Sequence, residues 1–284
     1  MMREYELFSH HIELALREFH FRQSTNPFRK IYGPLLSEYQ TAKNSCVQVQ
    51  AFARKILDAY RNNENKSSNK TVIRLIVENE TYVDDKHRVA EIVTMIIAAY
   101  ETTGNALGTA IILLAKHPKV SEKLHAELLS MDVANRSRSG YLRDVITESN
   151  RLLPVAAMGS TRQVGRDISC KGGTMVIPKG SIIFMPQILA HRCPTVFKDP
   201  SVFRPERWED ADNSMREALM GFSHGMRNCV GQSLAMAEIY STIPKLLANY
   251  SFEVEDEGEL DYFLTLKYVG CRLMASMVNN NPVQ

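Results

Sequence analysis

The 284-residue sequence lacks several features that would assign it early to a class of protein. It has 34 basic and 32 acidic residues, a net charge of +2 and no dominant cationic stretch, which argues against binding to nucleic acid or anionic lipid. Its five cysteines are an odd number and include no CxxC pair. Neither a disulfide framework nor a zinc cluster is therefore expected, and a reducing compartment is the simpler interpretation.

Long hydrophobic runs are also missing. The longest apolar run, from Ile92 to Tyr100, is far shorter than the roughly 20 residues that cross a bilayer. The N-terminus does not show the basic start and apolar stretch of a signal peptide. We therefore expect no membrane anchor within this chain.

Helical spacing of apolar residues is the dominant pattern along the chain. The predicted helices cover residues 1–61, 87–116, 120–131, 141–153 and 232–249. The last helix contains Pro244, which predicts a kink. The segment 62–70 is almost wholly Asn, Ser, Lys and Glu, and so predicts an exposed loop within a domain.

β structure is expected between Arg162 and Phe184. β-branched residues and the turn Pro178-Lys179-Gly180 predict a small sheet there, and a proline-rich, loop-rich stretch follows before Trp208. Several helices around a small separate sheet predict a mainly α fold with a segregated β region.

One segment combines residue types that suit a cofactor site. Residues 222–231 read FSHGMRNCVG, which places Cys229 in a glycine-flanked loop just before the last helix. Glycines let a flat cofactor approach the backbone, and a helix N-terminus favours a thiolate. Arg227 adds a cation that could pair with a carboxylate of a cofactor. Taken alone, however, Cys229 could equally be a buried and inert cysteine.

This segment matches FxxGxRxCxG, the signature of the cytochrome P450 superfamily, at Phe222, Gly225, Arg227, Cys229 and Gly231. The resemblance implies that Cys229 is the proximal iron ligand of haem b (heme b, iron protoporphyrin IX) and that Gly231 belongs to the cofactor site. It also implies that Arg227 pairs with a haem propionate and that Phe222 packs near the ligand. Arg162 matches, more weakly, another propionate-pairing arginine of the family; a solvated surface arginine is the alternative.

Two more segments resemble the family in the expected order. Glu148 and Arg151 form ExxR on a predicted helix, where a three-residue gap puts both side chains on one face. Residues 205–208 read PERW, similar to the family's PERF or PERW element. By resemblance, Glu148, Arg151 and Arg207 form a buried ion-pair network that fixes the region behind the haem, because buried charges are tolerable only when paired. Taken alone, ExxR could be a surface pair on a helix.

The long helix carries a further match. Residues 98–103 read AAYETT, similar to a family motif of a glycine, an acidic residue and a threonine pair, with Ala99 where the family usually has glycine. The resemblance implies that Glu101 and Thr102 are catalytic, lie over the distal face of the haem and help to deliver protons. The alternative is a mild helix distortion, since threonine hydroxyls often bond to the preceding turn.

The resemblance runs from about residue 87 to about residue 275. It implies one partial haem-binding domain over residues 1–284, with roof helices over residues 1–61 and a haem-binding core over residues 87–275. The implied reaction inserts one oxygen atom from O2 into a small apolar substrate, with electrons from NADPH through a flavoprotein reductase. The family expectation for location is the cytosolic face of the endoplasmic reticulum membrane.

Family members are much longer, and their upstream anchor and WxxxR contact to the haem have no counterpart here. We therefore expect either a fragment of a longer gene product or a degenerate protein. Two alternatives to a haem monooxygenase stay open. One is a haem-thiolate isomerase or dehydratase, against which Glu101 and Thr102 argue. The other is a truncated, non-catalytic protein with weak or no haem binding. His191 has no partner at metal-ligand spacing.

Overall fold

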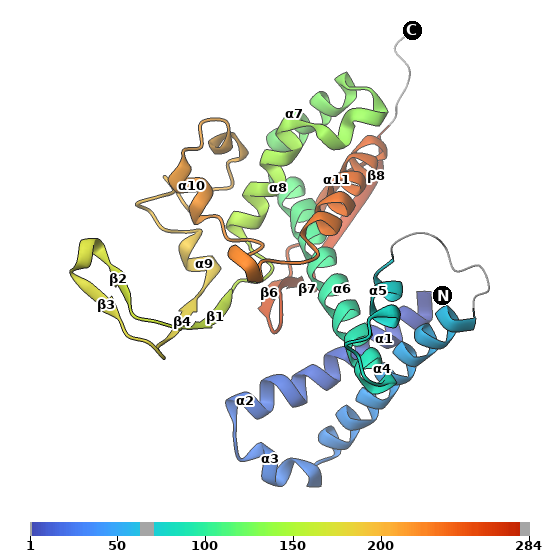
Figure 1. The fold of residues 1–284 in the computed structure, drawn as a ribbon. Helices are drawn as coiled ribbons and strands as arrows, with labels where there is room; N and C mark the ends of the chain where they lie inside the picture. Colours follow the sequence, from blue (N-terminus) through green and yellow to red (C-terminus); the bar gives the residue numbers. More distant parts are fainter. Residues whose placement is uncertain (1, 63–70, 279–284) are drawn as a thin grey trace. The chain divides into compact units, whose positions relative to one another are not determined.

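The computed structural model describes residues 2–62 and 71–278 (Figure 1). The predicted loop 62–70 lies outside these ranges, apart from Asn62, which ends a helix. The chain divides into two compact units, Met1–Tyr100 and Glu101–Gln284, and each is described by itself. The single domain expected from the sequence stays a prediction.

The described residues of the first unit form helices joined by short turns, with no strand among them. Its elements are α1 (Met2–Leu16), a π-helical turn (Arg17–Arg22), α2 (Gln23–Thr25), α3 (Arg29–Tyr32), a 3-10 turn (Gly33–Leu35), α4 (Ser37–Asn62), α5 (Val72–Glu78) and the start of α6 (Asp85–Lys116). The predicted helical character of residues 1–61 is thus confirmed, with short breaks. α1 packs on α4 through Phe8, Ile12 and Val49, and α4 packs on α5 and α6 through Leu57, Ile76 and similar apolar side chains.

Helix α6 continues into the second unit and ends at Lys116, directly before His117 and Pro118. Its bounds agree closely with the predicted helix 87–116. By length and composition it is the one helix of the described residues that could cross a membrane, although a core helix of a soluble protein passes the same test. The apolar run Ile92–Tyr100 covers only part of this helix, because Glu101 and two threonines follow it directly. The expected lack of an anchor stays a prediction.

The core of the second unit lies between four helices. These are the end of α6, α7 (Pro118–Ser130), α8 (Gly140–Leu152) and α11 (Gln232–Asn249), as Figure 1 shows. Their buried apolar side chains form one cluster that includes Leu114, Leu124, Leu142, Val145 and Ile243. Ser139 begins α8, because its hydroxyl accepts a hydrogen bond from the Leu142 amide at 2.9 Å. α11 continues through Pro244, which is buried.

Short segments connect α8 to α11. They include α9 (Gln187–Ala190), α10 (Asn213–Ala218) and 3-10 turns at Lys171–Gly173, Pro205–Trp208 and Gly225–Arg227. A further 3-10 turn, Val133–Arg138, lies between α7 and α8. The predicted small sheet is two antiparallel pairs, β1 (Ser160–Gln163) with β4 (Ile182–Met185), and β2 (Ile168–Cys170) with β3 (Met175–Ile177).

A second β region lies after α11 and was not predicted. β5 (Tyr250–Asp256) pairs with β8 (Arg272–Met277), and β6 (Glu259–Tyr262) pairs with β7 (Leu266–Val269), all antiparallel. The β structure therefore lies in two regions of a mainly α fold, and the sequence had indicated only the first of them. The sequence of β5 nevertheless carries the alternation of a half-buried strand, since Tyr250, Phe252 and Val254 alternate with polar residues, and Phe252 and Val254 are its less exposed positions.

The fully buried Ile243 tests how far the second unit depends on this helical core. We expect Ile243→Ala to lower the free energy of unfolding by about 2–5 kcal/mol, because it removes buried methyl groups and leaves a cavity. The control is Ile182→Ala, whose side chain is 74% exposed and should cost about 0.5 kcal/mol or less. Urea denaturation of both variants measures the difference, and equal losses would contradict this location of the core.

Candidate cofactor-binding site

Cys229 lies in a loop between α10 and α11 that backbone hydrogen bonds within the loop hold in shape. We name residues 220–231 the Cys loop. The Ser223 amide donates to the Met220 carbonyl at 2.8 Å, and the Cys229 amide donates to the Phe222 carbonyl at 2.9 Å. Gly225, with a φ of 80°, starts the 3-10 turn between them. The Cys229 side chain is exposed, two residues before the N-cap of α11.

Apolar side chains near Cys229 are left uncovered. Val230 is 89% exposed, Leu234 is 53% exposed, and Met226 is fully exposed. A Cβ placed on Gly225 would meet no atom within 4 Å, so the space beside the loop backbone is open. Exposed apolar groups close together in a chain are unfavourable in water and are typical of a surface that another apolar group covers.

Two arginines lie at the Cys loop. Arg227 is exposed, and within the described ranges its guanidinium has no hydrogen bond or ion pair with the protein. Arg162 on β1 is half-buried, and its Nη2 lies 3.5 Å from the hydroxyl oxygen of Ser223. The structure therefore brings Arg162 to the Cys loop, although it lies 67 positions before Cys229 in the sequence. An exposed thiol, open apolar surface and two guanidiniums for carboxylates together fit a haem.

The carboxylate of Glu148 is fully buried and accepts five hydrogen bonds. Oε1 accepts from Arg151 Nη2 at 2.9 Å, from Arg207 Nε at 2.8 Å and from the Arg204 amide at 2.9 Å. Oε2 accepts from Arg151 Nε at 2.9 Å and from Trp208 Nε1 at 3.0 Å. The structure thus brings together the three residues of the predicted network.

The other N–H groups of the two arginines in this network donate hydrogen bonds to backbone carbonyls. Arg151 donates to the carbonyls of His191, Pro200 and Val202. Arg207 donates to those of Lys198, Asp199 and Val202. All five N–H groups of Arg151 are therefore bonded, which offsets the cost of burying its charge. The network fixes residues 191–202, which contain little regular structure.

Sequence reasoning missed two members of this network, Trp208 and the backbone amide of Arg204. Trp208 belongs to the PERW element, and the N–H of a buried tryptophan needs a partner, so its role could have been found from that signal. The Arg204 amide leaves no trace in the sequence, because any residue except proline supplies one.

A scan against protein-family models matches residues 1–270 to the family described as cytochrome P450. The chain belongs to the cytochrome P450 family. It is 32% identical over 194 residues to cytochrome P450 3A6 of Oryctolagus cuniculus, which covers 65% of this chain and 38% of that protein. It is 29% identical over 264 residues to cytochrome P450 3A9 of Rattus norvegicus, which covers 81% of this chain and 52% of that one.

A solved structure confirms the predicted fold class. The crystal structure of the cytochrome P450 CYP102L1 superposes with a TM-score of 0.80 at 25% identity, over 95% of this chain and 64% of that one. This cytochrome P450 chain therefore has the mainly α fold expected from its motifs. It spans about half the length or less of the two curated relatives named above.

Glu101 of this cytochrome P450 chain is tied to the β6–β7 hairpin. The Thr265 hydroxyl donates to Glu101 Oε1 at 2.9 Å, and Lys267 Nζ lies 3.6 Å from the same oxygen. Asn105, one turn further along α6, donates to the Thr265 oxygen at 2.9 Å. Neither threonine nor lysine stands out in the hairpin sequence, so this contact could not be found from local patterns. The catalytic roles of Glu101 and Thr102 stay predictions.

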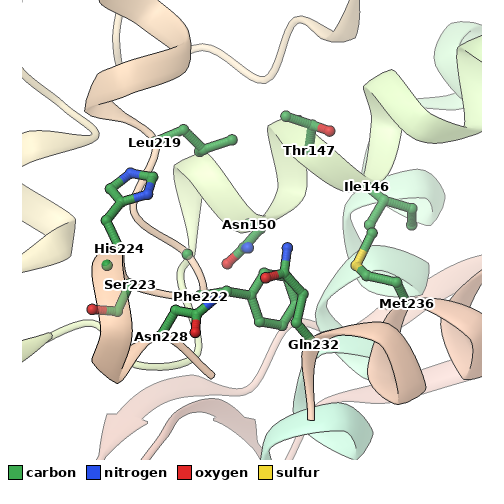
Figure 2. Close-up of a pocket in the computed structure, with 12 residues that line it drawn as sticks. Ile146, Thr147, Asn150, Leu219, Phe222, Ser223, His224, Asn228, Gln232 and Met236 are labelled. Carbon is green, nitrogen blue, oxygen red and sulfur yellow. The ribbon is translucent and has the colours of Figure 1, made fainter. Parts of the chain in front are cut away.

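A cavity of about 300 Å³ lies between α8, the Cys loop and α11. Figure 2 shows Asn150 of α8 beside Phe222 of the Cys loop near its centre, with Met236 of α11 at one side. Phe222, predicted to pack near the iron ligand, thus lines this cavity, whereas Cys229 does not. A Cβ on Gly221 would lie 2.1 Å from the Asn150 amide nitrogen, so only glycine fits there.

His191 is buried beside this region, and Met220 donates its amide to His191 Nε2 at 2.9 Å. Among the described residues, no group of three or more His, Cys, Asp and Glu side chains is arranged to hold a metal ion. A single axial ligand to a haem iron needs no such group.

We expect Glu148→Gln to lower the free energy of unfolding by about 3 kcal/mol or more, because two buried guanidiniums lose their counter-charge. Glu122→Gln on the exposed side of α7 is the matched control and should change it by about 0.5 kcal/mol or less. Chemical denaturation measures both variants. Similar stability of the two would mean that the backbone carbonyls alone hold Arg151 and Arg207.

Proposed function

We propose that this chain carries the haem site of a haem-thiolate monooxygenase, with Cys229 as the axial ligand. The carrying observation is the exposed Cys229 thiol in a family-type loop, beside open apolar surface and two arginines. A haem bound through a thiolate supplies the activation of O2 from which one oxygen atom enters an organic substrate. The proposed substrate is a small apolar molecule, and the proposed electron source is NADPH through a flavoprotein reductase.

The Cys loop supplies each property that such a cofactor needs. α11 has 18 residues, and its positive end lies two residues from Cys229, where it stabilises negative charge on the sulfur. Arg227 and Arg162 are available for the two propionates of haem b, whereas Val230 and Leu234 are available to cover its apolar ring. Gly231 leaves room beside the sulfur, since a Cβ there would meet only Cys229 Sγ, at 3.9 Å.

Glu101 and Thr102 are the proposed proton-delivery residues. The Thr265 hydroxyl donates to Oε1 of Glu101 and Lys267 lies near the same oxygen, whereas Oε2 accepts no hydrogen bond from the described residues. Oε2 is therefore the atom at which Glu101 can take up and release a proton. The Thr102 hydroxyl, on the next residue of α6, is the proposed neighbour in that transfer.

The proposed location is the cytosolic face of the endoplasmic reticulum membrane, in agreement with the family expectation.

The ion-pair network of Glu148, Arg151 and Arg207 serves in this proposal as a scaffold behind the haem. It acts through position, because its buried charges pair with one another and bond to backbone carbonyls.

The first test of this proposal is the absorption spectrum of the dithionite-reduced chain under carbon monoxide. We expect a strongly red-shifted Soret band, the signature of a thiolate ligand. We expect Cys229→Ala to lose that band and to bind haem weakly or not at all, because the iron loses its ligand. Cys170→Ala, in the β2–β3 hairpin, is the control and should keep it. A wild-type chain without a haem band would favour the non-catalytic alternative instead.

The two arginines give a separate prediction. Arg227→Gln should weaken haem binding about tenfold, because it removes a charge-assisted hydrogen bond worth about 1.5 kcal/mol or more. Arg216→Gln on α10, another exposed arginine, should leave haem affinity unchanged. Titration of the purified apoprotein with hemin measures both. Equal affinities for the two variants would exclude Arg227 from the cofactor site.

A further inference from the structure

A continuous path of hydrogen bonds and covalent bonds joins Glu148 to the Cys loop. Arg151, paired with Glu148, donates Nη1 to the carbonyl of His191 at 2.9 Å. The imidazole of the same His191 accepts the Met220 amide on Nε2 at 2.9 Å. Two residues beyond Met220, the Phe222 carbonyl accepts the amide of Cys229. His191 is the one residue in this path that contacts both the network and the Cys loop.

The chemical state of His191 suits an acceptor. Its ring is fully buried, and this burial lowers the pKa of His191 to about 4. The imidazole is therefore neutral at pH 7, and the Nε2 that meets the Met220 amide carries a lone pair rather than a proton. The His191 backbone is itself fixed, because it caps α9 and its amide donates to the carbonyl of Gln187, the first residue of that helix. A fixed acceptor thus faces the first residue of the Cys loop.

The surroundings of Met220 leave its position dependent on this bond. Gly221 lies directly against Asn150, and one side of the adjoining segment borders the cavity of about 300 Å³. Packing therefore restrains the start of the loop on the Asn150 side, whereas the side that borders the cavity is open. Met220 is half-buried, and an amide shielded from water costs free energy when it has no acceptor, so the hydrogen bond to His191 favours one placement of Met220 over others.

We propose that His191 is a positioning residue for the Cys229 sulfur, acting through the Met220 amide and the first residues of the Cys loop. This inference rests on the proposed haem-thiolate function only for its effect on the haem. Its structural part, that His191 Nε2 orders the loop, stands separately. The role differs from that of Arg227 or Arg162, because His191 would touch neither the cofactor nor the iron.

Two variants with amide side chains distinguish the effect of the hydrogen bond to Met220 from the effect of filling the space of the His191 ring. In His191→Gln the side-chain oxygen can reach the place of Nε2 and accept the Met220 amide. In His191→Asn the side chain is one methylene shorter and its oxygen cannot reach that place. His117→Asn is the matched control, because His117 bonds the Leu113 carbonyl and contacts the Phe203 ring but makes no bond to the Cys loop.

The first readout is amide hydrogen exchange of the full chain, which needs no haem. We expect the amides of Met220 and Cys229 to exchange about tenfold faster in His191→Asn than in His191→Gln or His117→Asn. Equal exchange in His191→Asn and His191→Gln would overturn the inference, because the ring would then serve only to fill space.

The second readout is the reduced carbon monoxide spectrum after addition of hemin. We expect His191→Asn to show a smaller fraction of the thiolate-type Soret band than His191→Gln, at equal bound haem. Equal fractions, with the exchange difference present, would overturn the proposed effect on the sulfur. A wild-type chain without the thiolate band would instead count against the haem-thiolate function, and amide exchange would still decide whether His191 orders the loop.

Discussion

The buried carboxylate of Glu148 is the constraint on which the second unit depends. It accepts five N–H donors from four residues, three of which lie in the segment 204–208. A buried cluster of one carboxylate and two guanidiniums is weak as a source of net stability, because desolvation offsets much of the Coulomb attraction. Its consequence is positional. Because Glu148 is fixed on α8, the segment from α9 to the PERW turn must take a course that lets the guanidinium of Arg207 reach this carboxylate.

This constraint explains how a segment with little regular structure can be ordered. Backbone carbonyls in helices and sheets find amide partners within the element, whereas those of a loop need other donors. Here Arg151 and Arg207 donate to carbonyls between His191 and Val202. The guanidinium groups thus supply the donors that a neighbouring strand would supply in a sheet. The Cys loop, which follows along the chain, can then leave Cys229, Met226 and Val230 exposed without having to hold the fold together.

Local patterns in the sequence were sufficient for the long helices and for the residues that meet within one element, whereas the short helices α5, α9 and α10 were not predicted. The ExxR spacing placed Glu148 and Arg151 on one face of α8, and their ion pair is at 2.9 Å. The β5–β8 region was missed although β5 alternates Tyr250, Phe252 and Val254 with polar residues, a pattern that could have indicated a strand. The Glu101 contact left no such pattern. Thr265 lies 164 positions away, and no spacing rule relates residues at that distance.

The two acidic residues of the family motifs differ in a way that separates structure from chemistry. Glu148 has no solvent exposure and both its oxygens are saturated by donors, so protonation would break several charge-assisted bonds at once. Glu101 keeps 18% of its side chain exposed, and among the described residues only its Oε1 accepts a hydrogen bond. A carboxylate can exchange protons only through an oxygen that solvent or substrate can reach. Within this chain, Glu101 meets that condition and Glu148 does not, which supports a scaffold role for one acid and proton transfer for the other.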